Sequence, residues 1–296
     1  VYREQTGQIV ENEWRKTMDL SKVPFVYENM GLFEHKIIYY ETSRGCPFSC
    51  SYCLSSIDKC LRFRDLELVK KELQFFIDHK VPQVKFVDRT FNCKHDHAMT
   101  VWRYIKEHDN GITNFHFEVA ADLLNEEEME LIKTMRPGLI QLEIGVQSTN
   151  PDTVKEIHRT MDFEKVSENV RAVQKNGNVH QHLDLIAGLP GEHPEEMEDT
   201  LRQIKELAPD SLTVHALAMK HGSRLTRERA ASTEKQNYKQ MARELEEMID
   251  MARKAAGEMG LYPYYLYRQK NIAGNFENVG YAKVDKAGIY NILIME

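Results

Sequence analysis

Three cysteines lie within eight residues of this 296-residue chain, at Cys46, Cys50 and Cys53. They are three of its five cysteines and follow the pattern C-x3-C-x2-C. Thiolates are soft metal ligands, and a short loop can wrap three of them around one iron–sulfur cluster. Gly45 and Pro47 favour a tight, irregular loop here over a helix. Because such clusters usually have four protein ligands, a cluster held by three leaves one iron open.

Two other interpretations of the cysteines are weaker. A structural zinc site needs a fourth ligand, and Cys60, seven residues further on, is a poor match to a second C-x2-C pair. A disulfide framework is disfavoured because the number of cysteines is odd and no signal peptide is seen. We expect Cys60 and Cys93 to be ordinary thiols.

The composition, with 42% apolar and 29% charged residues, is that of a globular protein in water. A net charge of −7, from 39 basic and 46 acidic residues, argues against nucleic-acid binding as the main function. No apolar run approaches the roughly 20 residues of a membrane span. Reduced thiols indicate a reducing, cytoplasmic compartment. The chain begins at Val1 and ends in the strand-like run 292–296, so we expect it to be part of a longer protein.

Strand and helix patterns alternate between residues 36 and 220, which predicts an α/β fold with a parallel sheet. Strands are expected at 36–40, 83–87, 114–119, 139–145, 182–187 and 212–218. Apolar stripes at helical spacing cover 66–76, 163–173 and 197–207. Residues 1–35 form a lead-in, of which 24–27 should pack on the sheet. An extension over 221–296 should contain a charged connector at 224–230, a helix from Tyr238 to near Gly257 or Gly260, a strand at 262–268 and a Gly/Asn-rich loop at 271–281.

The motif Cys46-x3-Cys50-x-Tyr52-Cys53 resembles the cluster loop of the radical S-adenosylmethionine (SAM) superfamily. The resemblance implies a partial (β/α)6 TIM-like barrel over 36–220, with a small C-terminal α+β extension on the substrate side. It implies a [4Fe–4S] cluster on the three cysteines, with SAM bound at the open iron. Reductive cleavage of SAM, fed by an electron donor such as a flavodoxin or ferredoxin, would give a 5′-deoxyadenosyl radical that abstracts a hydrogen atom from a small-molecule substrate.

Polar residues at the carboxyl ends of the strands are expected to face the active site. Glu118 is one of them, because a charged group at a barrel mouth is costly unless it binds something. An ion pair with a neighbouring Arg is the alternative for Glu118. The resemblance implies SAM contacts for Asp88, Glu143, Gln147, Arg159, Asp184, Ile186 and Ala216. Among these, Arg159 would pair with the SAM carboxylate, and Asp88 is equally compatible with a solvated turn. The roles of the histidines stay open at His116, His180, His182 and His215.

Two parts of the chain resemble different radical SAM families. Residues 36–190 are similar to the core of enzymes that carry a cobalamin-binding domain, and residues 186–296 to oxygen-independent coproporphyrinogen III oxidase-like proteins. The markers are 39–46 and 86–92 for the first, and 212–220 and 264–281 for the second. The cluster loop departs from the second family, because Ser55 stands where an aromatic residue is usual and a fourth cysteine is lacking. A hybrid chain or a divergent member of either family fits this pattern.

We therefore expect a radical SAM enzyme, oxidoreductase-like, with a porphyrinogen-type tetrapyrrole as the leading substrate hypothesis. A cobalamin-type radical SAM enzyme that lacks its cobalamin domain, such as a methyltransferase, is the first alternative. A heme-binding or heme-delivery protein without turnover is the second, and a structural zinc protein is the third. Neither a nucleic acid nor a membrane is expected as a partner.

Overall fold

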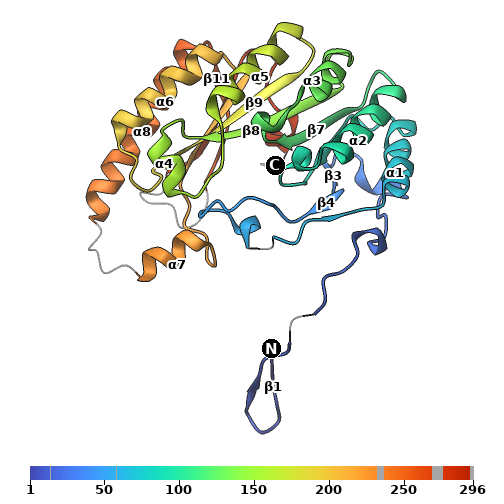
Figure 1. Cartoon of the computed structure of the whole chain (residues 1–296), viewed down its shortest axis with the longest axis horizontal. Coiled ribbons are helices and arrows are strands. Elements are labelled where there is room, and N and C mark those ends of the chain that lie inside the picture. The colour runs from blue at the N-terminus through green and yellow to red at the C-terminus, as the bar shows by residue number, and fades with distance from the viewer. Residues whose placement is uncertain (14, 58, 232–236, 269–275, 294–296) are drawn as a thin grey trace.

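A mostly parallel, eight-stranded sheet runs through the computed structural model (Figure 1). The structure describes residues 1–13, 15–57, 59–231, 237–268 and 276–293. Six parallel strands follow one another across the sheet: β3 (Ile38–Tyr40), β6 (Gln83–Phe86), β7 (Asn114–Val119), β8 (Ile140–Gln147), β9 (His180–Ala187) and β10 (Ser211–Ala216). Two antiparallel strands, β12 (Asn278–Ala282) and β11 (Tyr262–Tyr267), continue it beyond β10. Within the described residues β3 and β11 are the two edges and do not pair, so the barrel is open.

Helices cover the outer face of this sheet (Figure 1). They are α1 (Leu66–Asp78), α2 (His95–Glu107), α3 (Glu126–Lys133), α5 (Phe163–Asn176), α6 (Pro194–Leu207) and α8 (Tyr238–Glu258). Their apolar stripes pack on alternate strand residues, as Val84 and Phe86 of β6 show by being fully buried in the core. Lys85, between them, points to the opposite, inner face of the sheet. That inner face is polar, and the candidate site is built on it.

The predicted alternation of strands and helices is confirmed. All six predicted parallel strands are present, with ends within two residues of those expected. The three apolar stripes correspond to α1, α5 and α6, and the long helix α8 ends at Glu258, just before Gly260. The helices α2 and α3 complete the pattern, although no apolar stripe was named for either of them in the sequence.

The C-terminal part contains three corrections to the predicted elements. The stretch 224–230, expected as a charged connector, belongs to helix α7 (Arg224–Ala231), which is anchored by the buried side chain of Leu225. The end of the chain, expected as a strand from residue 292, is in its described part the end of helix α9 (Ile289–Leu293). Residues 278–281 of the expected Gly/Asn-rich loop lie in β12, while 271–275 are outside the described residues.

Gly280 explains why the sequence of β12 was expected to form a loop. It pairs with Tyr265 in the β11–β12 ladder. A Cβ atom added to Gly280 would lie 1.8 Å from Cε1 of Tyr265. The glycine therefore serves the close approach of a tyrosine ring and not a turn.

The N-terminal lead-in begins with a small hairpin, β1 (Tyr2–Arg3) and β2 (Ile9–Val10), that stands away from the sheet (Figure 1). Further on, the rings of Phe25 and Tyr27 pack against Phe76 of α1, at 5.5 and 5.4 Å between centroids. This confirms the predicted packing of 24–27. Among the described helices, none combines the length and the apolar character that crossing a bilayer requires.

Candidate active site

The loop with the three cysteines leaves the carboxyl end of β3 and is closed at its base. Two short strands, β4 (Ser43–Arg44) and β5 (Arg62–Phe63), pair antiparallel and bring its ends together. Gly45, with φ +99°, lies so close to the returning chain that a Cβ atom on it would be 2.7 Å from the carbonyl oxygen of Cys60. Only glycine meets both requirements without strain.

The side chain of Asp88 is hydrogen-bonded to the start of strand β4. Its fully buried carboxylate accepts hydrogen bonds from the Thr42 amide at 3.0 Å, the Thr42 hydroxyl at 2.7 Å and the Ser43 hydroxyl at 2.6 Å. Burial raises the pKa of Asp88 to about 6, although these donors oppose the shift. The alternative of a solvated turn is therefore wrong. The side chain supports the cluster loop and does not line the cavity beside it, so a SAM contact at Asp88 stays a prediction for its backbone.

A cavity of about 200 Å³ lies between the cluster loop and the carboxyl ends of β7, β8 and β9. It brings together residues that are far apart in the sequence: all three cysteines and five of the eight predicted SAM contacts. These are Cys46, Cys50, Cys53, Glu118, Glu143, Gln147, Arg159 and Asp184. Two other predicted contacts, Ile186 and Ala216, are buried outside its lining; Ile186 lies in a small apolar cluster with Ile157 and Leu217.

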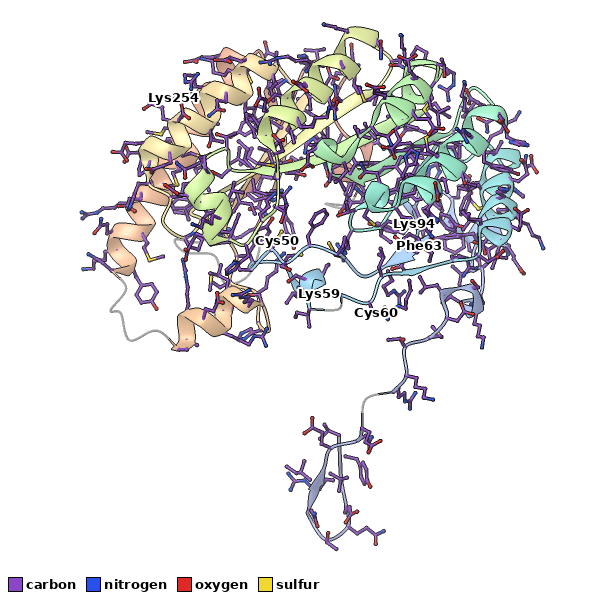
Figure 2. The ribbon with its side chains drawn as sticks, in the orientation of Figure 1. Cys50, Lys59, Cys60, Phe63, Lys94 and Lys254 are labelled. Carbon is purple, nitrogen blue, oxygen red and sulfur yellow. The ribbon has the colours of Figure 1, made fainter. Side chains whose placement is uncertain are left out.

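The three cysteines border this cavity from the loop side, and Figure 2 shows Cys50 where the loop passes beneath the sheet. Cys46 and Cys50 are buried and Cys53 is half-buried. The pKa of the Cys46 thiol is raised above its ordinary value, mainly because the thiol is buried. In the described part of the chain, no three His, Cys, Asp or Glu side chains converge on one ion position. A [4Fe–4S] cluster does not require such convergence, because each thiolate binds a different iron.

Arg159 reaches the cavity from the turn that follows helix α4 (Pro151–Glu156). Its Nη2 donates to the carbonyl oxygen of Gly145, and its Nη1 lies 3.5 Å from the hydroxyl of Tyr52 and 3.8 Å from Sγ of Cys50. The buried Nε of Arg159 has no hydrogen-bond partner within the described structure. A guanidinium whose buried Nε is an unmatched donor is suited to bind an anionic group such as a carboxylate.

Gln147 presents a second unmatched polar atom to the same cavity. The ladder between β8 and β9 shifts register between Gly145 and Gln147, and Gln147 has φ +73°. A Cβ atom on Gly145 would lie 2.5 Å from Nε2 of Gln147, so the glycine gives this side chain room. The buried Oε1 of Gln147 has no partner among the described residues. It can accept a hydrogen bond from a ligand.

Glu118 and Glu143 lie directly opposite each other on β7 and β8 and share one buried cation. The Lys85 ammonium is 2.6 Å from Oε2 of Glu143 and 3.4 Å from Oε1 of Glu118, and the side chain is 2% exposed. The expected ion-pair alternative for Glu118 thus exists, with a lysine in place of an arginine. Burial raises the pKa of Glu118 to about 7. Burial also opposes the ionisation of Glu143, but Lys85 and His116 outweigh it and hold its pKa well below the usual range.

The histidines complete the inner face. Nε2 of His116 lies 2.9 Å from Glu143, and burial together with Lys85 lowers the pKa of His116 to about 4. Oδ1 of Asp184 lies 3.3 Å from Nε2 of His182 and 3.2 Å from Nε2 of His215. His180 lies 2.7 Å from the hydroxyl of Ser211, deeper along the same face. None of these rings lines the cavity. His116, His182 and His215 contact the carboxylates that do.

Sequence reasoning missed Lys85 and two tyrosines of the inner face, Tyr290 and Tyr265. The ring of Tyr290, from α9, lies 5.1 Å from the Lys85 ammonium. Tyr265, from β11, hydrogen-bonds Thr213 at 2.9 Å, and Thr213 in turn lies 2.8 Å from His182. A lysine inside the apolar run Val84–Val87 was the available signal, because such a residue requires a buried partner.

Comparison with known proteins identifies the family. The family described as "Radical SAM superfamily" matches residues 40–204, which is more than half of the chain. The chain belongs to the radical SAM superfamily. The match includes the cluster loop and every strand from β6 to β9.

Relatives from both groups that the sequence suggested match this chain. The chain is 34% identical over 237 residues to "Oxygen-independent coproporphyrinogen-III oxidase-like protein HemZ" of Bacillus subtilis, covering 68% of this chain and 46% of HemZ. It is 26% identical over 182 residues to "Cobalamin-dependent radical SAM methyltransferase TokK" of Streptomyces tokunonensis, covering 56% of this chain and 25% of TokK. The chain thus spans less than half the length of these relatives.

A solved structure confirms the fold. The radical S-adenosylmethionine methyltransferase TsrM from Kitasatospora setae, described with cobalamin and a [4Fe–4S] cluster bound, superimposes with a TM-score of 0.62 at 16% identity. The similarity covers 90% of this chain and 53% of TsrM. The radical SAM fold predicted from the cluster loop is therefore correct.

Proposed function

We propose that this chain holds a [4Fe–4S] cluster on Cys46, Cys50 and Cys53, binds SAM in the adjoining cavity, and acts as a radical SAM enzyme. The observation that carries the proposal is the cavity itself, which gathers the three thiols, two arginines and four acidic side chains. When bound, the cluster and SAM would supply a one-electron reductive cleavage that yields methionine and a 5′-deoxyadenosyl radical for hydrogen abstraction.

The side chains around the cavity match the charges of SAM. SAM carries one carboxylate, one ammonium and one sulfonium group. Arg159 would hold the carboxylate through its unmatched Nε, and Gln147 would accept a hydrogen bond from a donor on SAM. Glu118 and Asp184 line the same cavity and would face its positive groups and ribose hydroxyls. The main role of Ile186 and Ala216 would be to shape the adenine side through backbone and apolar contacts.

The substrate proposal rests on the C-terminal part of the chain. We propose 36–220 as the SAM-cleaving barrel and 221–296 as the substrate-side extension, because Tyr264, Tyr265 and Tyr290 reach the inner face from it. Similarity to HemZ supports a porphyrinogen-type tetrapyrrole as substrate. Similarity to TokK supports the alternative, a cobalamin-type methyltransferase whose cobalamin domain would be supplied separately. Either activity requires the reducing conditions of the cytoplasm.

The test is anaerobic reconstitution with iron and sulfide, reduction with dithionite in the presence of SAM, and assay of 5′-deoxyadenosine. Wild type is compared with Cys50→Ala, which removes a cavity thiol, and Cys60→Ala, which removes an exposed one outside the cavity. We expect product from wild type and Cys60→Ala, and none from Cys50→Ala. Zinc without iron or sulfide in the purified protein would contradict the proposal.

A second assay separates the substrates. Porphyrinogen consumption and methyl transfer from methylcobalamin are measured side by side with the active protein. Tight, stoichiometric heme binding without SAM cleavage would favour a heme-delivery protein instead.

A further inference from the structure

A second cavity, of about 240 Å³, lies between the loop that follows β9 and the helices α7 and α8 (Figure 1). We call it the methionine cavity, after Met219, Met241 and Met248 in its wall. It shares no lining residue with the cavity beside the cysteines. The small apolar cluster around Ile186 borders both, with Tyr52 at the first cavity and Leu217 at the second. The proposed reaction makes no use of the methionine cavity.

The wall of the methionine cavity is largely apolar. Leu189, Leu217 and Leu245 complete it beside the three methionines. Gly188, with φ +81°, lets the loop approach α8, because a Cβ atom on it would lie 3.3 Å from Cδ1 of Leu245. Thioether sulfurs are polarisable and make favourable contacts with the edges of aromatic rings. The wall therefore suits a flat, aromatic body.

Glu192 presents an unmatched acceptor to this cavity. The residue is only 4% exposed. Its Oε1 accepts a hydrogen bond from the Ser148 hydroxyl at 2.5 Å. Its Oε2 is buried and has no hydrogen-bond partner among the described residues. A buried carboxylate oxygen without a donor is costly, so a ligand that brings an N–H or O–H group to it is favoured.

Arg229 of α7 presents unmatched donors to the same cavity. Its half-buried side chain has one polar contact among the described residues, from Nη1 to Sδ of Met219 at 3.5 Å. A thioether is a weak acceptor without charge. Glu244, which also lines the cavity, lies instead 3.6 Å from Nδ1 of His193. A guanidinium that lacks a carboxylate partner is suited to bind one from a ligand in two parallel hydrogen bonds.

We propose that the methionine cavity binds a small aromatic carboxylic acid whose ring carries an N–H or O–H donor. Arg229 would hold the carboxylate, Glu192 would accept the ring donor, and the methionines would pack on the ring. An ammonium beside the carboxylate would meet Arg229 as a like charge, so the donor is assigned to the ring. A volume of about 240 Å³ is below the roughly 300–1,000 Å³ of sites for drug-sized ligands, so the ligand is small.

The first test compares three probes on the full wild-type chain by isothermal titration calorimetry. Indole-3-propionate has the aromatic body, the carboxylate and a ring N–H. Tryptamine replaces the carboxylate by an ammonium, and the N-methylated analogue of indole-3-propionate lacks the ring donor. We expect a Kd on the order of 0.1 mM for indole-3-propionate, at least about tenfold weaker binding of tryptamine, and about threefold to tenfold weaker binding of the N-methylated analogue.

The second test assigns these preferences to the two polar side chains. Arg229→Gln should weaken binding of indole-3-propionate by about tenfold or more, the value of a charge-assisted hydrogen bond. Arg227→Gln is the matched control, because Arg227 is exposed on the same helix and does not line the cavity, and it should stay within about twofold of wild type. Glu192→Gln should reduce the preference for N–H over N-methyl to less than about twofold.

Several results would overturn the proposal. Absence of binding, or equal binding of tryptamine and indole-3-propionate, would do so in the wild type alone, so the test stays decisive if a variant fails to fold. Equal losses in Arg229→Gln and Arg227→Gln would reveal a general effect of charge. Strict competition by SAM or 5′-deoxyadenosine would assign the cavity to SAM. Binding of the probe without any 5′-deoxyadenosine formation in the reductive assay would refute the proposed function alone, because probe binding requires no cluster.

Discussion

Replacing Lys85 by methionine tests whether the inner face depends on one buried cation. Methionine keeps most of the side-chain volume and removes the charge. The ammonium of Lys85 is 2.6 Å from Glu143, 3.4 Å from Glu118 and 3.3 Å from Nε2 of His116. In wild type, burial and Lys85 lower the pKa of His116 to about 4, so the imidazole is neutral near pH 7 and Lys85 is the cation that the two carboxylates share.

The substitution should cost about 3–5 kcal/mol in free energy of unfolding, the usual effect of leaving a buried charge without its partner. Its pH dependence between about 8 and 6 should also become steeper, because in wild type Glu118, whose pKa is raised to about 7, is the carboxyl of this pair that favours the folded state as the pH falls through that range. In wild type the depressed pKa of Glu143 stabilises the fold above the unfolded pKa and this contribution is lost in acid. Without Lys85 the two carboxyls share a proton and their pKa values rise. The folded variant then binds more protons than its unfolded chain, so it should gain stability as the pH falls from about 8 to about 6.

Chemical unfolding of the cluster-free protein, repeated across this pH range, measures both effects. Lys254→Met is the matched control, since Lys254 is exposed, and it should change the free energy by less than about 0.5 kcal/mol. Adding Glu143→Gln to Lys85→Met should recover part of the loss, because it removes the unpaired charge. A loss below about 1 kcal/mol for Lys85→Met, or a further loss in the double variant, would refute an ion cluster at this place.

Four further substitutions test the site and the packing around it. Gly280→Ala should destabilise the fold by about 1–3 kcal/mol in a thermal unfolding assay, because its Cβ would meet the Tyr265 ring. Gly257→Ala, inside α8 with no atom within 4 Å of its Cβ, should stabilise it by about 0.5–1 kcal/mol, and a loss there would contradict the packing. Arg159→Met should weaken SAM binding by about tenfold to a hundredfold in equilibrium titration of the reconstituted protein, the value of a charge-assisted hydrogen bond; unchanged affinity would remove Arg159 from the SAM site. Asp88→Asn should lower the iron bound per chain, and its loss of stability should be larger near pH 5 than near pH 7, because the raised pKa of Asp88 gives most stability below about 4 and loses it by about 6.

The sequence predicted the fold because local pattern and topology agree. Alternation in runs such as Val84–Val87 and helical spacing in runs such as Leu66–Phe76 each describe one element, and their order implies a parallel sheet. The cysteine loop was predictable for the same reason, since all of its ligands lie within eight residues. Lys85 was not, because its partners come from β7 and β8 and are fixed only by strand register.

Register also explains why neither of the two family resemblances decides the substrate by itself. They meet between β9 and β10, two neighbouring strands, of which β10 is paired with β9 along its whole length. The hydrogen-bonded series from Tyr265 through Thr213 and His182 to Asp184 crosses this junction. Asp184 lines the cavity beside the cysteines, whereas Tyr265 belongs to the part that resembles coproporphyrinogen oxidase-like proteins. We therefore expect a change at Tyr265 to alter the orientation of the Asp184 carboxylate, and the substrate to depend on both parts of the chain together.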